Sequence, residues 1–286
     1  MATITVPQVV PSPVEDAEAL MKAFQGWGTD EQAVIYILAH RDAAQRKLIR
    51  LAYEEKYDER LTDRLESELS GDLQTAMGYW VLDPTERQAV IANAATKCID
   101  EEYPVIVEIA CANSPAELLE VKRAYHAIYK RSLEEDVAAG ATGNLRNLLV
   151  ALVSAYRYDG DEVNGGLARS EAKIIQADVK NGVTADHGEL IRVLGTRSRA
   201  QLGATFNCFR DEHGTTVTKV LRNAMHKSGT DEESLLRVVV MRAEKDLRGI
   251  KDEFHKRASV ALEQAIAKET SGDFKTFITA LVGTSQ

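Results

Sequence analysis

The chain has 286 residues, with 35 basic and 44 acidic side chains and a formal net charge of −9. This negative charge disfavours direct binding to nucleic acid and to anionic lipid, so contact with a phosphate surface would require an intervening cation. The low content of proline (six) and glycine (18), together with abundant Ala, Leu, Glu, Lys and Arg, predicts a mostly helical protein.

Two further features concern the compartment. The three cysteines are far apart, which fits a reducing compartment and no metal cluster: Cys98, Cys111 and Cys208. No secretory signal is recognisable, and the longest apolar run, 148–155, is far below the roughly 18 residues that span a bilayer. We therefore expect a cytoplasmic protein.

In chain order, a proline-containing tail (1–14) precedes a series of helices. Pro7, Pro11 and Pro13 favour an extended conformation in the tail. Apolar residues then recur with helical spacing in five segments, which are 15–24, 32–40, 43–57, 59–68 and 73–82. The sequence predicts an all-α fold that begins with a five-helix unit.

This unit returns along the chain without strong sequence identity. An offset of 201 carries Arg41 to Arg242 and Glu68 to Glu269, and an offset of 156 carries Arg41 to Arg197. An offset of 72 carries Tyr53 to Tyr125, although Arg41 then becomes Asn113. We predict four repeats, at 15–84, 85–157, 167–219 and 220–286, with a polar linker at 158–166 that divides the chain into halves. The aromatic positions of the repeat are expected in its core: Tyr53, Tyr125 and Phe254.

A glycine-containing loop stands between the first two helices of the first and fourth repeats. It reads Phe24-Gln25-Gly26-Trp27-Gly28-Thr29 in the first, and Met225-His226-Lys227-Ser228-Gly229-Thr230 in the fourth. Glycine permits positive φ, and carbonyls at a helix C-terminus lack intrahelical partners and can face a cation. Thr29 and Thr230 are expected to cap the helices that follow.

A glutamate follows each loop at the same distance. Glu68 stands forty residues after Gly28, and Glu269 forty residues after Gly229. Calcium takes six to eight oxygen ligands in a forgiving geometry, and the Phe24, Gly26 and Gly28 carbonyls with one carboxylate would supply part of such a shell. A single copy would fit an ordinary helical hairpin with a solvated glutamate, but two copies in register favour a calcium site.

With these loops, spacings and repeats, the sequence resembles the annexins, and the plant annexins in particular, over essentially the whole chain. The resemblance implies four repeats of five helices in a curved disc, and reversible binding to acidic phospholipid membranes when calcium rises. It implies ligands in the first repeat at Phe24, Gly26, Gly28 and Glu68. In the fourth repeat it implies a weaker site, because Lys227 replaces a glycine of the motif, with ligands at Met225, Lys227, Gly229 and Glu269.

The chain departs from the family pattern in the other two repeats. Repeat two has 97–102 in place of the loop and Gly140 in place of the glutamate, and repeat three has 181–185, so neither is expected to bind calcium. Between Gly214 and the fourth-repeat loop the chain is about thirty residues shorter than the family plan, which truncates the third repeat.

Several alternatives stay open. Trp27 either inserts among lipid headgroups or packs against the protein. His40 would be the centre of a peroxidase-like or redox activity, but we expect no enzyme because no accompanying haem pattern is present. Ile191-Arg192-Val193 resembles an actin-binding tripeptide and also fits one turn of an amphipathic helix, and 211–214 matches a short GTP pattern near chance. F-actin binding and oligomerisation on membranes therefore remain open.

Overall fold

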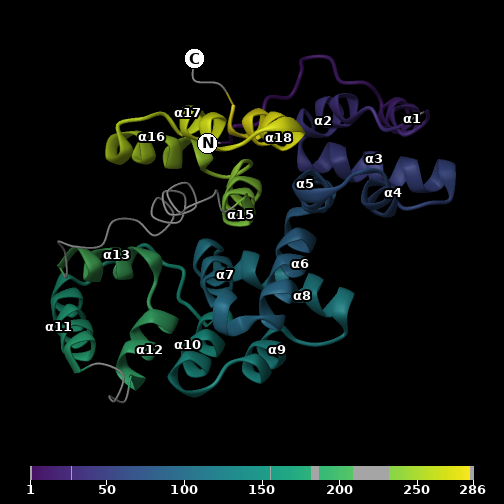
Figure 1. The fold of residues 1–286 in the computed structure, drawn as a ribbon. Coiled ribbons are helices and arrows are strands. Elements are labelled where there is room, and N and C mark those ends of the chain that lie inside the picture. Colours follow the sequence, from purple (N-terminus) through teal and green to yellow (C-terminus); the bar gives the residue numbers. More distant parts are fainter. Residues whose placement is uncertain (1, 27, 155, 182–186, 209–231, 284–286) are drawn as a thin grey trace. The chain divides into compact units, whose positions relative to one another are not determined.

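The computed structural model describes residues 2–26, 28–154, 156–181, 187–208 and 232–283, and within these ranges every regular element is a helix (Figure 1). The predicted all-α class is confirmed. The first repeat contains α1 (Pro13–Ala23), α2 (Glu31–Ala39), α3 (Ala43–Tyr57), α4 (Leu61–Glu68) and α5 (Gly71–Val81). Its helix starts follow from capping: Ser12 forms a reciprocal capping box with Glu15, and Asp42 forms one with Gln45.

The second repeat has the same five-helix order. Its helices are α6 (Pro84–Lys97), α7 (Ile99–Ala112), α8 (Pro115–Tyr129), α9 (Leu133–Gly140) and α10 (Gly143–Val153). The third repeat is described over α11 (Gly165–Asn181), α12 (Gly188–Thr196) and α13 (Arg199–Cys208). The fourth is described over α15 (Glu232–Arg242), α16 (Leu247–Ala258), α17 (Leu262–Glu269) and α18 (Gly272–Val282).

Residues with positive φ recur at equivalent positions of the repeats. A non-glycine residue with positive φ ends the third helix of three repeats, at Asp58, Lys130 and Ser259 (φ 52°, 59° and 57°). A positive-φ glycine starts the fifth helix of the same repeats, at Gly71, Gly143 and Gly272. Both sets are related by the offsets of 72 and 201 seen in the sequence, so the repeated unit is a repeated backbone path. The exact repeat boundaries stay a prediction.

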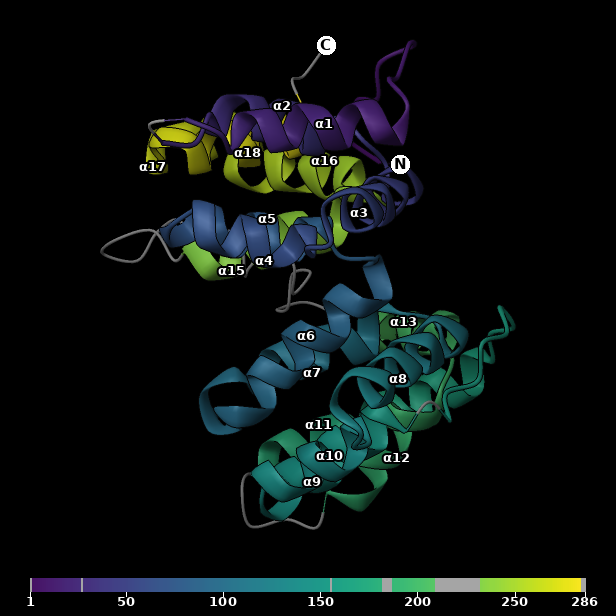
Figure 2. The ribbon, with the colours of Figure 1, turned by 90° about the vertical axis from the view of Figure 1, so that its right-hand side faces the viewer.

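The chain divides into two compact units that do not follow its two halves. One unit contains 1–84 and 214–286, and the other contains 85–213. The linker at 158–166 therefore does not separate the packed bodies, because the first and fourth repeats share one hydrophobic core. In this first unit α2 lies along α18 (Figure 1, Figure 2), and α5 contacts α15 and α18. The predicted aromatic positions are buried, with Tyr53, Tyr125 and Phe254 at most 2% exposed.

Trp80 and Arg46 join the two repeats of the first unit. The Trp80 indole N–H donates to the Leu38 carbonyl at 2.8 Å, and its ring meets Phe277 edge-on at 6.3 Å between centroids. The Arg46 guanidinium lies 3.8 Å from the Trp80 ring centroid and pairs with Glu244 at 3.0 Å. Burial lowers the pKa of Arg46, and the charge of Glu244 opposes that shift.

The N-terminal tail docks on the fourth repeat. The Thr3 backbone N–H donates to the Ala243 carbonyl at 2.8 Å, and the Thr3 hydroxyl donates to the Leu281 carbonyl. Thr3 is buried as a result. The tail thus contributes to the packing of the first unit, which its proline content alone did not indicate.

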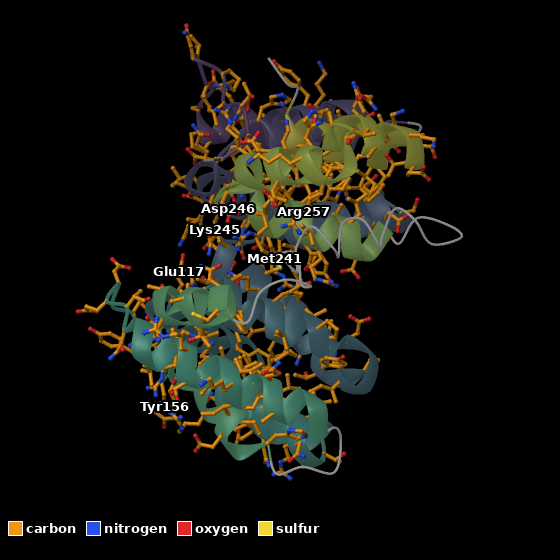
Figure 3. The ribbon with its side chains drawn as sticks, turned by 90° about the vertical axis from the view of Figure 1, so that its left-hand side faces the viewer. Glu117, Tyr156, Met241, Lys245, Asp246 and Arg257 are labelled. Carbon is orange, nitrogen blue, oxygen red and sulfur yellow. The ribbon has the colours of Figure 1, made fainter. Side chains whose placement is uncertain are left out.

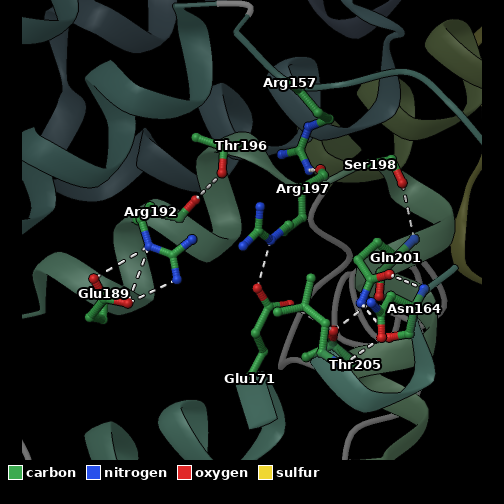
Figure 4. Close-up of polar contacts among 11 residues, drawn as sticks. Arg157, Asn164, Glu171, Glu189, Arg192, Thr196, Arg197, Ser198, Gln201 and Thr205 are labelled. Atoms are coloured by element: carbon green, nitrogen blue, oxygen red, sulfur yellow. Dashed lines mark hydrogen bonds and ion pairs between the residues drawn. The ribbon is translucent and has the colours of Figure 1, made fainter. Parts of the chain in front are cut away.

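A buried polar pair joins the first helix of a repeat to the residues after its second helix. In repeat one, Arg41 donates two hydrogen bonds to Asp16, at 2.7 and 2.9 Å. In repeat three, Arg197 pairs with Glu171 at 2.6 Å, and the Thr205 hydroxyl donates to the same carboxylate (Figure 4). Arg242, at the corresponding position of the fourth repeat, pairs instead with the nearby and partly exposed Asp246. Asp246 is labelled in Figure 3.

Repeat two builds the corresponding contact without charge. Asn113, which occupies the Arg41 position, donates from its amide to the side-chain oxygen of Gln88, which occupies the Asp16 position. The shorter Asp16 is therefore replaced by the longer Gln88, and the longer Arg41 by the shorter Asn113. Each pair spans the same interhelical gap with a complementary hydrogen bond.

Candidate metal site

The first-repeat loop runs between the C-terminus of α1 and the start of α2. Phe24 is the last residue in helical conformation, and the Asp30 N–H donates back to the Ala23 carbonyl at 2.9 Å, which closes the loop. Gly26 and Gly28 have φ of +135° and +107°, which side-chain-bearing residues rarely adopt. The glycines of the motif are thus required by the backbone path itself.

Three backbone carbonyls of the loop have no hydrogen-bond partner within the described part of the chain. Among the described residues, no hydrogen bond reaches the carbonyl oxygens of Phe24, Gly26 or Gly28. The Phe24 side chain is buried and meets Tyr53 edge-on at 6.4 Å, so it anchors the loop to the core. Carbonyl groups of this kind, on an exposed loop that is anchored to the core, can accept hydrogen bonds from water or coordinate a hard cation.

Glu68 lies beside this loop. It is the last residue of α4, and the Thr29 hydroxyl donates to its Oε2 at 2.6 Å and to its backbone carbonyl at 3.3 Å. The expectation that Thr29 caps α2 is wrong: the N-cap is Asp30, whose carboxylate accepts from the Ala33 N–H at 3.0 Å. Thr29 is instead the residue that ties the distant carboxylate to the loop.

A positive charge also faces the carboxylate. Arg64, one helical turn before Glu68, places its Nε 3.3 Å from Glu68 Oε1. Its guanidinium carbon lies 5.9 Å from the Phe24 ring centroid. Tyr53 lies close to this pair, and its pKa is raised to about 12, chiefly by burial of its hydroxyl. The charges of Glu59 and Glu68 contribute to this rise, and the charge of Arg64 opposes it. The sequence signal for Arg64 is its i, i+4 spacing from Glu68, which belongs to no loop motif.

The donor set fits a hard, oxygen-liking cation such as calcium. It consists of carbonyl oxygens and one carboxylate, and within the described ranges no group of three or more His, Cys, Asp or Glu side chains could hold a metal. The described residues therefore contain no cluster of cysteine and histidine ligands of the kind that binds a softer metal.

Repeat two has lost the corresponding space. Helices α6 and α7 are joined directly through Cys98, so no extended loop forms. A Cβ added to Gly140, which stands at the Glu68 position, would lie 3.0 Å from Ile99 Cγ2 and 3.1 Å from the Thr96 carbonyl oxygen. A side chain at this position would therefore crowd Ile99 and Thr96. That repeat two binds no calcium stays a prediction.

The remaining predicted site residues are only partly described. Met225, Lys227, Gly229 and Thr230 lie outside the described residues, as do Trp27, the loop segment 182–185 of repeat three and the motif 211–214. Glu269 is described: it ends α17 as Glu68 ends α4, and Lys268 Nζ lies 3.7 Å from its carboxylate.

The residues of the alternative readings have ordinary structural surroundings. His40 ends α2, with its Nδ1 hydrogen-bonded to the Tyr36 carbonyl at 2.8 Å and its ring 5.1 Å from that of Tyr36. Arg192 pairs with Glu189 on the same helix at 2.8 Å (Figure 4). The neighbouring Val193 is buried. The 191–193 tripeptide is thus one turn of the amphipathic α12.

These observations define a class: an all-helical protein of repeated five-helix units, with a glycine loop and a distant glutamate placed together in the first. Comparison with known proteins gives the family. The annexin sequence model matches residues 15–79, 87–152 and 216–281. Annexin-like protein RJ4 of Fragaria ananassa is 51% identical, with 94% of this chain and 95% of the relative covered, and Annexin D7 of Arabidopsis thaliana is 47% identical, with 99% of each covered.

Solved structures agree. Annexin III superposes with a TM-score of 0.90 at 29% identity, covering 100% of this chain and 98% of that one, and chicken annexin V with 0.87 at 30%, covering 99% of each. The chain belongs to the annexin family, and the predicted annexin-like fold is confirmed. Calcium-dependent phospholipid binding follows as the family property, and the curated relatives are named as annexins rather than as enzymes.

Two further findings bear on the predictions. Across the described residues, no helix combines the length and apolar character needed to cross a bilayer. The alignments with Annexin D7 and Annexin D2 extend over 313 and 314 residues, more than the 286 of this chain, and the family match leaves out 153–215. The shortening at the junction of repeats three and four stays a prediction.

Proposed function

We propose that the loop carbonyls of Phe24, Gly26 and Gly28 and the carboxylate of Glu68 bind calcium, and that the bound ion links the protein to acidic phospholipid. The observation that supports this most directly is the Thr29 hydrogen bond, which holds Glu68 beside a loop with three carbonyls that accept no hydrogen bond from the described residues. Four or five protein oxygens leave two or three positions of a calcium shell open.

The open positions explain how an acidic protein reaches an acidic surface. With a net charge of −9, the chain is repelled by anionic lipid unless a cation intervenes. Bound calcium supplies positive charge and vacant coordination positions that a lipid phosphate can fill. The loop is suited to this because its glycines keep the backbone exposed while Phe24 fixes it to the core. By linkage, lipid tightens calcium binding by the same factor as calcium tightens lipid binding.

The proposal extends to the fourth repeat and to Trp27. Met225, Lys227 and Gly229 would supply carbonyls with Glu269 as the acid, in a weaker site because a lysine stands where the motif has glycine. Trp27, which stands between the two glycines of the first loop in the sequence, would lie among the headgroups. The protein would then be cytoplasmic and peripheral at membranes when calcium rises. We propose binding rather than catalysis as its activity, since no contact of His40 favours peroxidase chemistry and none of Arg192 favours F-actin.

The test is co-sedimentation with phosphatidylserine vesicles across a calcium titration, comparing the wild type with Glu68→Gln. Loss of the only side-chain ligand of the first site should raise the half-maximal calcium about tenfold or more. Glu66→Gln, two residues away on the exposed side of α4, is the matched control and should leave the titration unchanged. Identical titrations for Glu68→Gln and the wild type would falsify the proposal.

A further inference from the structure

We infer that Arg64 competes with calcium for Glu68 and thereby sets the calcium concentration at which the first loop becomes occupied. This inference rests on the proposed function. It starts from the two oxygens of the Glu68 carboxylate, both of which have protein partners: Oε2 accepts from the Thr29 hydroxyl at 2.6 Å, and Oε1 lies 3.3 Å from Arg64 Nε. A cation that binds Glu68 must displace or share at least one of these partners.

The two partners hold the carboxylate in different ways. Thr29 makes a short hydrogen bond and is itself part of the loop, so it can stay on one oxygen while the other coordinates. Arg64 Nε is buried and makes no hydrogen bond of good geometry, so its interaction with Glu68 is one of charge. Arg64 is thus the partner that a divalent cation would displace, because both offer positive charge to the same oxygen.

The position of the guanidinium makes it a competitor even when it is displaced. The side chains of Arg64 and Glu68 are 28% and 22% exposed, so water screens their charges only in part. The guanidinium carbon lies 5.9 Å from the ring centroid of Phe24, the residue that supplies the first carbonyl of the loop. A positive charge held there repels a cation in the loop.

The fourth repeat lacks this feature. The residue four positions before Glu269 is Ala265, so no arginine occupies the corresponding place on α17. Lys268, which lies 3.7 Å from the Glu269 carboxylate, is 82% exposed and well hydrated. An arginine four residues before the glutamate is therefore present in the first repeat and replaced by alanine in the fourth.

The experiment measures the half-maximal calcium for binding to phosphatidylserine vesicles, and calcium binding without lipid by isothermal titration calorimetry, for charge variants of Arg64. Arg64→Gln should lower the half-maximal calcium about three- to tenfold, and Arg64→Met should do the same while keeping an apolar stem over Phe24. Arg64→Lys keeps the charge and should stay within about twofold of the wild type.

Two controls separate this inference from general charge effects and from the proposed function. Arg60→Gln removes the same charge one turn earlier, where Arg60 pairs with the exposed Asp63, and should change the half-maximal calcium less than about twofold. In a Glu68→Gln background, Arg64→Gln should have no further effect, because its target is gone.

The outcomes are distinct. An unchanged or raised half-maximal calcium in both Arg64→Gln and Arg64→Met, with a normal circular dichroism spectrum, overturns the inference and makes Arg64 a neutral or positioning residue. If Glu68→Gln itself binds calcium and vesicles like the wild type, the proposed site fails instead, whatever the Arg64 variants do.

Discussion

The buried Asp16–Arg41 pair gives the most specific prediction about stability. Both side chains are almost completely buried, at 4% and 3% exposure, and they share two hydrogen bonds of 2.7 and 2.9 Å. Arg41 also donates to the His40 carbonyl at 3.1 Å. Asp16→Asn leaves the Arg41 charge buried without its counter-ion, which should cost about 3–5 kcal/mol. For a chain of this size that corresponds to a fall in Tm of roughly 6–20 °C.

The second repeat supplies the compensating change. Its Gln88–Asn113 pair occupies the same two positions with neutral amides, so the double variant Asp16→Gln/Arg41→Asn introduces into repeat one a pair that the fold already accommodates. Each single substitution should be strongly destabilising, while the double variant should lie within about 1–2 kcal/mol of the wild type. Thermal and urea unfolding, followed by circular dichroism, measure the three variants. If the double variant loses the sum of the two single losses, the two repeats do not share this contact and the reasoning is refuted.

Two predictions concern the surroundings of the site. Gly28→Ala places a side chain at a φ of +107°, which should cost about 1–3 kcal/mol in backbone strain or distort the loop. The half-maximal calcium for vesicle binding should therefore rise. An unchanged titration would show that calcium binding does not need this backbone conformation. Tyr53, whose hydroxyl is buried without a partner in the structure, should tolerate Tyr53→Phe with little loss of stability at neutral pH. Because the pKa of Tyr53 is raised from 10 to about 12, its contribution is fully present below pH 10 and is lost as the pH rises toward 12, so Tyr53→Phe should resist alkaline unfolding better than the wild type. Equal alkaline midpoints would contradict this origin of the shift.

Much of the fold followed from the sequence because the repeat is encoded twice, in apolar spacing and in its turns. Gly71 and Gly272, for example, are related by the offset of 201 and start equivalent helices with positive φ. The packing of the first repeat against the fourth could not be predicted in this way. Helical periodicity shows which face of α2 or α18 is apolar, but it does not show which distant helix covers that face.

The candidate site shows the same division. The loop glycines and Glu68 could be predicted from the sequence because their spacing occurs twice in the chain. The glycines are needed for the backbone conformation of the loop, and Glu68 is needed for its negative charge. The role of Thr29 was misassigned, because Thr29 and Asp30 are both good caps and only the tertiary contact with α4 decides between them. The opposing charge of Arg64 has only a weak sequence signal, its i, i+4 spacing from Glu68, because the contact depends on side-chain direction at the end of α4.

The most direct test of the central claim is a crystal structure of the protein grown with calcium. The account predicts an ion at about 2.3–2.6 Å from the carbonyl oxygens of Phe24, Gly26 and Gly28 and from at least one oxygen of Glu68. Well-ordered density for this loop with no ion in it, or an ion held elsewhere while Glu68 keeps both Thr29 and Arg64, would contradict it.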